Sequence, residues 1–250
     1  MTGYIVGRLL QIPITLGIIL IISFVLIQAA PGDPVAALAG DYVTQEYRER
    51  IIQHYGLDQS LWQQGIRYFQ NVLRGNFGDS YYFKASVAQV IGERLPQTLL
   101  LVIPSVILSS LIGILLGFIA TKSANPVLSS GIPLCATLLN SIPIFWLAYL
   151  LLLFFSVKLE WFPIKGMVNA RIMSTGIDYF LDVLHHLALP LLTMVVSQLA
   201  QILLLTRTRL REEIQNPYFR TALSKGLSQG RATIHHALPN AMLPVITVIG

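Results

Sequence analysis

The chain has 250 residues, of which 54% are hydrophobic and only 12% charged, and its mean hydropathy is +0.65. Soluble domains carry about 25% charged residues, so this composition excludes a soluble globular domain and predicts an integral membrane protein. The net charge of +5 is not gathered into a basic patch interleaved with aromatic residues, so nucleic-acid binding is not predicted. Cys135 is the only cysteine, which excludes a disulfide framework or a cysteine metal cluster.

Apolar runs without charged residues divide the chain into membrane-spanning segments. Each of the four complete runs is close to or above the roughly 20 residues that a transmembrane helix needs. They cover residues 9–30, 97–121, 131–157 and 187–206. A fifth run starts near residue 237 and reaches residue 250 without a basic anchor, so we expect it to be cut short in a truncated product. The pattern predicts an all-α polytopic membrane protein.

The first apolar run does not have the form of a secretory signal. It is longer than the roughly 7 to 15 apolar residues of a signal core, and Pro31 would directly follow the cleavage site. We therefore expect residues 1–30 to hold the N-terminus and the first membrane helix.

Residues 31–96 form a long polar loop that is too small for an independent enzyme domain. Helical patterns cover about residues 44–55, ending at Gly56, and residues 60–73, before a glycine-rich turn. An amphipathic stretch over residues 86–94 then leads to Pro96, where we expect the second span to begin. This lobe is expected to pack on the membrane helices.

Small residues recur every four positions in the second span, at Ser105, Ser109, Gly113 and Gly117. This spacing predicts a groove where another helix approaches closely, which is a main source of helix association in lipid. A pivot on which helices rock is compatible with the same pattern, but packing alone is the simpler interpretation.

Polar side chains without charge occur in the third and fourth spans. The third carries Asn140, Ser141 and the kink-prone Pro143, and the fourth carries Thr193, Ser197, Gln198 and Gln201. They either line a passage for a polar solute or act as hydrogen-bonding glue between helices, and glue is slightly favoured. No complete span contains Asp, Glu, Lys, Arg or His, so a proton relay inside the membrane is not predicted.

Asp178, Asp182 and His186 lie at i, i+4 and i+8 on a possible helix outside the membrane. Carboxylate and imidazole groups on one face could hold a transition metal weakly. A solvated helix surface explains the same pattern better, so no metal site is predicted.

The segment after the fourth span is polar and basic, although membrane spans lie on both sides of it. Asn216 and Pro217 form a helix start, and Gly226 a helix stop. The helix between them is too short to persist alone in water. Its apolar stripe is formed by Phe219, Ala222, Leu223 and Gly226. We expect a partner protein to cover this stripe; the alternative is that it lies on the headgroups or against neighbouring membrane helices.

Basic residues give the orientation. An N-terminus inside the cell leaves Glu212 and Glu213 as the only acidic residues of the cytoplasmic segments. The basic residues there are Arg8, Lys122, Arg207, Arg209, Arg211, Arg220, Lys225 and Arg231. This bias predicts a cytoplasmic N-terminus and a cytoplasmic loop over residues 207–239.

The chain carries no catalytic motif that would make it an enzyme. It has no phosphate-binding loop for ATP, no nucleophile elbow and no zinc-protease helix. If transport is driven by energy, that energy must enter through another protein, and no cofactor is predicted.

The cytoplasmic segment resembles the coupling loop of the membrane permeases of ATP-binding-cassette (ABC) importers. That loop has an E-A-A triplet, three residues, a glycine, nine residues and I-x-L-P; here residues 220–222, Gly226 and residues 236–239 keep the spacing. The residue sequence of this loop is similar to that of the dipeptide, oligopeptide and nickel permease branch. Five further motifs occur along the chain in the same order as in that branch. They are Ala30-Pro-Gly-Asp-Pro34, Tyr55-Gly-Leu-Asp58, Gly75-Asn-Phe-Gly-Asp-Ser80, Leu95-Pro-Gln-Thr98 and Ser141-Ile-Pro-Ile-Phe-Trp146.

This resemblance implies a type I importer permease fold in a bacterial cytoplasmic (inner) membrane, with five spans visible and a sixth missing. It divides the chain into residues 1–30, an extracytoplasmic lobe at 31–96, and a permease core at 97–250 that contains the loop 207–239. The implied partners are a second permease subunit, two cytoplasmic ATPases, an extracytoplasmic solute-binding protein and the lipid bilayer. ATP hydrolysis is implied on the partners, and the solute is a di- or oligopeptide, nickel or a metal chelate.

The resemblance also implies which residues meet the ATPase. Gly226 keeps the turn tight, Phe219 and Leu223 are expected to be buried anchors, and Arg220 and Lys225 to pair with acidic groups. The full set is Tyr218, Phe219, Arg220, Thr221, Ala222, Leu223, Lys225, Gly226, His236, Leu238 and Pro239. The candidate translocation path holds Asn140, Ser141, Gln198 and Gln201. Two rival functions stay open at this point: an ATP-independent channel or carrier, and a membrane-embedded enzyme, which the lack of a catalytic set disfavours.

Overall fold

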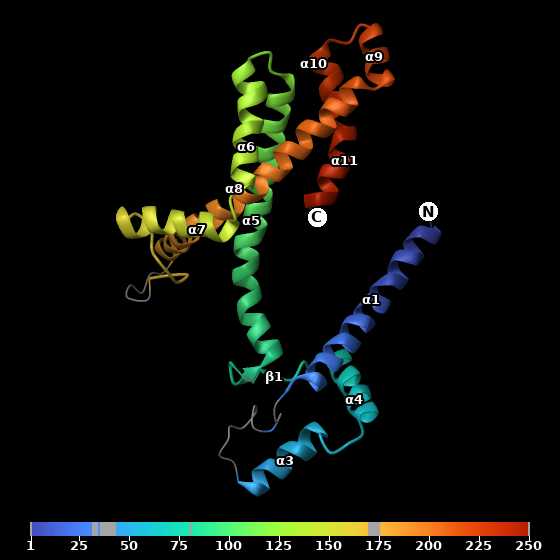
Figure 1. Cartoon of the computed structure of the whole chain (residues 1–250), viewed down its shortest axis with the longest axis vertical. Coiled ribbons are helices and arrows are strands. Elements are labelled where there is room, and N and C mark those ends of the chain that lie inside the picture. Colours follow the sequence, from blue (N-terminus) through green and yellow to red (C-terminus); the bar gives the residue numbers. More distant parts are fainter. Residues whose placement is uncertain (1, 32–34, 36–43, 81, 170–175, 250) are drawn as a thin grey trace. The chain divides into compact units, whose positions relative to one another are not determined.

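The computed structural model describes residues 2–31, 35, 44–80, 82–169 and 176–249. The chain divides into two compact units, Met1–Pro96 and Gln97–Gly250. Four helices are long and apolar enough to cross a membrane, or five spans result if one bent helix pair is counted as a single span. The predicted all-α membrane architecture is confirmed (Figure 1).

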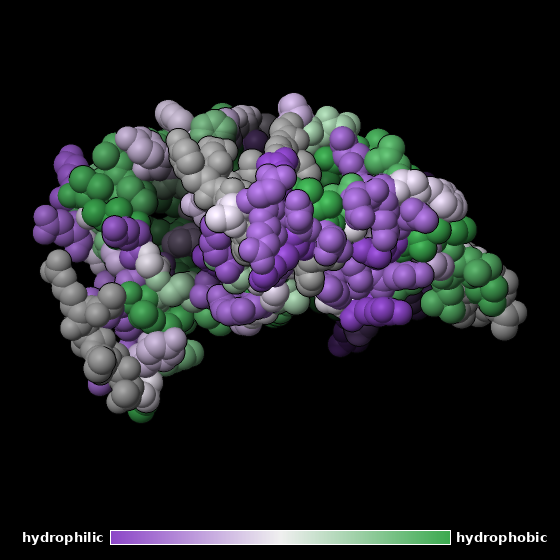
Figure 2. Space-filling view, turned by 90° about the horizontal axis from the view of Figure 1, so that it is seen from below, coloured by the Kyte–Doolittle hydropathy of each residue, from purple (hydrophilic) through white to green (hydrophobic). Residues whose placement is uncertain are grey.

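The first unit begins with α1 (Thr2–Ala29), whose apolar side chains from Val6 to Ile27 are mostly exposed. In the polar lobe, α3 (Gln45–Tyr55) ends at Gly56, whose φ of +68° favours glycine. Ser60 caps α4 (Leu61–Leu73) through a reciprocal capping box with Gln63. A two-stranded hairpin, β1 (Asp79–Ser80) and β2 (Ala85–Ser86), follows. Hydrophilic side chains gather over this lobe (Figure 2).

Helix α4 packs on the C-terminal end of α1. The rings of Phe24 and Tyr68 have centroids 5.8 Å apart, and Gln28 Nε2 donates to Gln64 Oε1 at 2.7 Å. The two predicted helices of the lobe are confirmed, and at least one of them packs on a membrane helix.

The second span forms one long helix, α5 (Val87–Lys122), and its predicted start at Pro96 is wrong. The helix begins at Val87 because Ser86 Oγ accepts the Gln89 amide at 3.2 Å, which satisfies a free donor of the first turn. The amphipathic approach and the apolar run are therefore one continuous helix.

The third predicted span is bent rather than straight. A π-helical turn, η1 (Val127–Gly131), leads into α6 (Ile132–Asn140), and α7 (Ile144–Leu151) continues into η2 (Leu152–Lys158). The two halves meet at 94° (Figure 1). Pro143 causes the break, because the residue before a proline is disfavoured in the α region. The Pro143 carbonyl oxygen then starts α7 by accepting hydrogen bonds from the amides of Trp146 and Leu147.

The fourth span lies in α8 (Ile177–Gln215), which forms the centre of the second unit. It is followed by α9 (Pro217–Ser224), α10 (Gln229–Ala232), the π-helical segment η3 (Thr233–Ala237) and α11 (Leu238–Ile249). Both α6 and α11 pack along α8 (Figure 1).

The small-residue face of α5 packs directly on the backbone of α8, which confirms its predicted packing role. Ser105, Ser109, Gly113 and Gly117 are all buried. A Cβ atom on Gly113 would lie 3.2 Å from the Leu199 carbonyl oxygen, and one on Gly117 only 2.9 Å from the Leu203 carbonyl oxygen. The absence of side chains is what lets the two helices approach this closely.

This packing predicts opposite effects for two glycine substitutions in the same helix. Gly117→Ala should destabilise the protein by about 1–3 kcal/mol, because backbone atoms cannot move away from the new methyl group. Gly92→Ala should leave the protein unchanged or stabilise it by up to about 1 kcal/mol, because its Cβ would meet nothing within 4 Å. Thermal unfolding of the purified variants in detergent measures both, and equal effects of the two substitutions would contradict the packing account.

Candidate functional site

The predicted cytoplasmic loop is a compact cluster of short helices at one end of α8. Asn216 ends the helical conformation of α8 with extended backbone angles, φ −65° and ψ 147°, and Pro217 starts α9. Gly226 ends it with a φ of +88°, so the glycine stop signal is confirmed. The Asn216 side chain does not cap the helix as predicted; its Nδ2 donates to Glu213 Oε2 at 2.9 Å instead.

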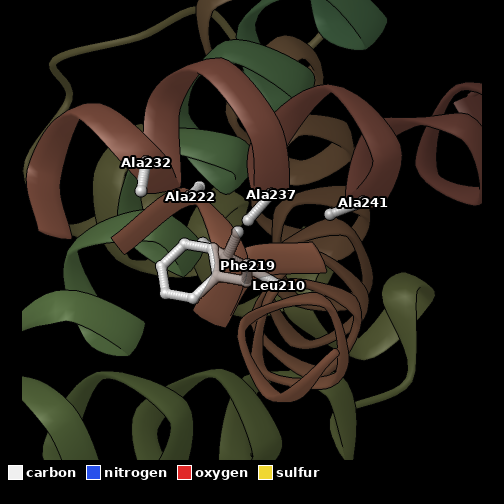
Figure 3. Packing of buried hydrophobic residues seen from close by; sticks show 6 residues of the cluster. All are labelled: Leu210, Phe219, Ala222, Ala232, Ala237 and Ala241. Atoms are coloured by element: carbon white, nitrogen blue, oxygen red, sulfur yellow. The ribbon is translucent and has the colours of Figure 1, made fainter. Parts of the chain in front are cut away.

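The apolar stripe of α9 is buried within the chain itself. Phe219 is 2% exposed and packs against Leu210 of α8 (Figure 3). Around them lie four alanines contributed by α9, α10, η3 and α11. These are Ala222, Ala232, Ala237 and Ala241, all buried.

The expectation that a partner covers this stripe is therefore wrong for Phe219 and Ala222. The open alternative, cover by neighbouring helices, is correct for these two residues. It arises because α10, η3 and α11 return the chain across α9, and because alanine side chains are small enough to let these helices approach. Phe219 cannot serve as an anchor buried in a partner while it is buried here.

Other side chains of the loop stay exposed, including Leu223 at the edge of the stripe. Leu223 is 37% exposed and Tyr218 36%, so both retain accessible surface. Arg220, Thr221 and Lys225 are exposed on α9, as are His236 and Pro239 beyond it, while Leu238 is half-buried. The accessible surface of the loop is thus basic, and Leu223 on α9 and Ile234 on η3 are its exposed large aliphatic side chains.

A hydrogen-bonded group fixes the base of α9. The Tyr218 hydroxyl donates to Glu213 Oε2 at 2.5 Å and lies 3.4 Å from the His236 carbonyl oxygen. Burial, followed by the hydrogen bond to Glu213, raises the pKa of Tyr218, and a hydrogen bond with the Asn240 side chain opposes this shift. The hydroxyl therefore stays protonated and can donate.

Sequence reasoning missed Glu213 and Asn240 as members of this group. A usable signal was present for Glu213, since a carboxylate in the last turn of a helix opposes the helix dipole and needs a local partner. Asn240 carries no such signal, because its proximity to Tyr218 depends on the return of the chain through α10 and η3.

Two other cations hold the loop region to the neighbouring helices. Arg207 Nη2 donates to the Ser129 carbonyl oxygen at 3.1 Å, which ties α8 to the turn before α6. Lys122, at the end of α5, lies beside α10, where a Cβ on Gly230 would be 3.0 Å from its Nζ. The end of α5 and the end of α8 therefore both contact the segments around the loop.

The four residues of the predicted translocation path are not brought together by hydrogen bonds in the described part of the chain. Gln198 Oε1 accepts a hydrogen bond from Ser109 Oγ at 3.4 Å, so Gln198 links α8 to α5, as expected of hydrogen-bonding glue between helices. Gln201 is exposed on α8, and Asn140 and Ser141 are exposed at the break between α6 and α7.

The candidate metal residues form a pair rather than a ligand set. His186 Nδ1 lies 3.3 Å from Asp182 Oδ1, and Asp182 Oδ2 accepts the Asn169 amide at 2.6 Å. Asp178 is exposed and does not join them. No group of three potential ligands occurs among the residues that the structure describes, so the geometry does not support the metal hypothesis.

Comparison with known proteins identifies the family of this chain. Residues 113–250 match the family described as Binding-protein-dependent transport system inner membrane component, and residues 1–102 match its N-terminal family. The chain belongs to this permease family. The predicted resemblance to an ABC importer permease is thereby confirmed, together with the type I importer permease fold.

Three relatives show how far the similarity extends. The oligopeptide transport system permease protein AppB of Bacillus subtilis is 37% identical over 100% of this chain and 78% of AppB. The di/tripeptide permease DppB of Pseudomonas aeruginosa is 34% identical over 100% of this chain and 79% of its own length. The dipeptide permease DppB of Escherichia coli is 32% identical, with the same two shares.

Burial of Phe219 predicts a structural cost that its exposed neighbour on the stripe does not share. Phe219→Ala should destabilise the permease by about 3–5 kcal/mol, because it leaves a cavity beside Leu210. Leu223→Ala should cost about 1 kcal/mol or less, since Leu223 already has access to solvent. Thermal unfolding in detergent distinguishes the two; a Leu223 cost equal to that of Phe219 would contradict the assigned faces of α9.

Proposed function

We propose that this permease is one of two membrane subunits of an ATP-driven importer of di- or oligopeptides, coupled to cytoplasmic ATPases through loop 216–239. The observation that carries the solute class is that the relatives matched over the whole chain are named oligopeptide, di/tripeptide and dipeptide permeases. Nickel or a metal chelate remains the second candidate from the resemblance, and it is separated from peptide by experiment.

The exposed face of α9 supports the coupling role. It presents Leu223 beside Arg220 and Lys225, a small apolar anchor flanked by positive charge, which suits a groove with acidic rims on an ATPase. Phe219 and Ala222 contribute from inside, because they fix α9 to α8 and α11. In this proposal Tyr218, Thr221, Gly226, His236, Leu238 and Pro239 shape the surface that the ATPase meets.

The charge bias and the permease family support the following arrangement in the membrane. We place the N-terminus and loop 207–239 in the cytoplasm, residues 31–96 outside the bacterial inner membrane, and residues 97–250 as the permease core. Exposed polar groups at membrane depth, Asn140, Ser141 and Gln201, then face the second permease subunit across a path for the solute. An extracytoplasmic binding protein delivers that solute.

Uptake into proteoliposomes tests the proposal. The permease is reconstituted with its second membrane subunit and both ATPases, and radiolabelled dipeptide or Ni²⁺ is offered together with the binding protein. We expect dipeptide uptake that requires ATP and fails when the ATPases are omitted. Uptake without ATPases would favour the rival channel or carrier, and uptake of Ni²⁺ but not dipeptide would replace the solute class while keeping the coupling.

A further inference from the structure

Glu213 occupies a position where its charge is locally unfavourable. It lies in the last turn of the 39-residue helix α8, where the free carbonyl groups carry partial negative charge. No basic residue occurs in that last turn to compensate it. Its neighbour Glu212 is paired with Arg209 at 2.9 Å, whereas Glu213 bonds to the segment that follows the helix.

The Glu213 carboxylate holds two successive pieces of the loop through one oxygen. Oε2 accepts from Asn216 Nδ2 at 2.9 Å and from the Tyr218 hydroxyl at 2.5 Å. A hydroxyl donating to a carboxylate over 2.5–2.7 Å is a charge-assisted bond, roughly twice as strong as a neutral one. These two directional hydrogen bonds therefore fix the orientation of α9 relative to the end of α8 as well as the distance between them.

The same tyrosine also reaches the chain that returns to the membrane. Its hydroxyl lies 3.4 Å from the His236 carbonyl oxygen in η3, and the nearby Asn240 side chain in α11 acts to lower its pKa. One hydroxyl group of α9 therefore bonds to α8 and lies beside η3 and α11. Apolar contacts around Phe219 hold these helices together but are non-directional, so they permit α9 to roll or slide.

We propose that Glu213 is a positioning residue for energy coupling, which acts through the Tyr218 hydroxyl to make α9 move as one body with α8 and α11. Displacement of α9 then turns both membrane helices together. Without the bond between Tyr218 and Glu213, α9 rotates against the alanines that pack around Phe219, and part of the displacement is lost. This role rests on the proposed function, since it needs an ATPase that moves α9.

The fully assembled transporter in proteoliposomes tests the role with Glu213→Ala, Tyr218→Phe and the matched control Glu212→Ala. We expect Glu213→Ala and Tyr218→Phe each to lower the peptide transported per ATP hydrolysed by about tenfold. In Glu213→Ala, which lies outside the surface assigned to the ATPase, the amount of co-purified ATPase and the binding-protein concentration for half-maximal hydrolysis should stay unchanged. Glu212→Ala, which removes an exposed ion pair, should behave as the wild type.

Two further variants separate positioning from a folding defect. Glu213→Gln keeps an oxygen that accepts from Tyr218, so its loss should be about threefold or less. The double variant Glu213→Ala/Tyr218→Phe should lose no more than Glu213→Ala alone, because that substitution already removes the bond to Tyr218.

Several results would overturn the role. They are an unchanged transport-to-ATP ratio in Tyr218→Phe and Glu213→Ala, loss of ATPase association in Glu213→Ala, or an equal loss of the transport-to-ATP ratio in Glu212→Ala. A wild-type transporter that shows no ATP-dependent uptake would instead overturn the proposed function, and with it the role of Glu213.

Discussion

The contact between Phe219 and Leu210 is the interaction on which the cytoplasmic part of the permease depends. Helix α9 has only eight residues and would not persist alone, because short isolated helices do not repay the cost of nucleation. Phe219 gives it a place on the end of α8, and the alanines of the returning chain close over the ring. A loop between two membrane spans thereby becomes a folded element that can transmit force.

Close backbone packing continues this connection into the membrane part of the second unit. Gly113 and Gly117 let α5 approach the carbonyl groups of α8, while α11 packs along α8 as it leaves the loop. Because closely packed interiors deform little, we expect movement at the end of α8 to be carried along the helix. The chain has no ATP-binding loop of its own, so in the proposed function that movement comes from a partner ATPase.

Local signals predicted the parts of the fold that local physics determines. Gly56 and Gly226 adopt the left-handed angles expected of helix stops, and the helix predicted over residues 60–73 is found at Leu61–Leu73. The 94° bend was not predicted, although Pro143 was recognised as kink-prone, because the angle depends on what packs around the break. Burial of Phe219 and the bond to Glu213 were missed for the same reason: both depend on how the chain returns from α10 to α11.

Site-directed cross-linking in native membranes tests the central claim most directly. The claim is that α9 shows one face to an ATPase and keeps the other inside the permease. Single cysteines at Leu223 and Ala222, in a Cys135→Ala background, differ by one residue in sequence but lie on the exposed and the buried face. The account predicts capture of a cytoplasmic ATPase from Leu223→Cys and not from Ala222→Cys. Equal capture from both positions, or none from Leu223→Cys while peptide uptake persists, would contradict it.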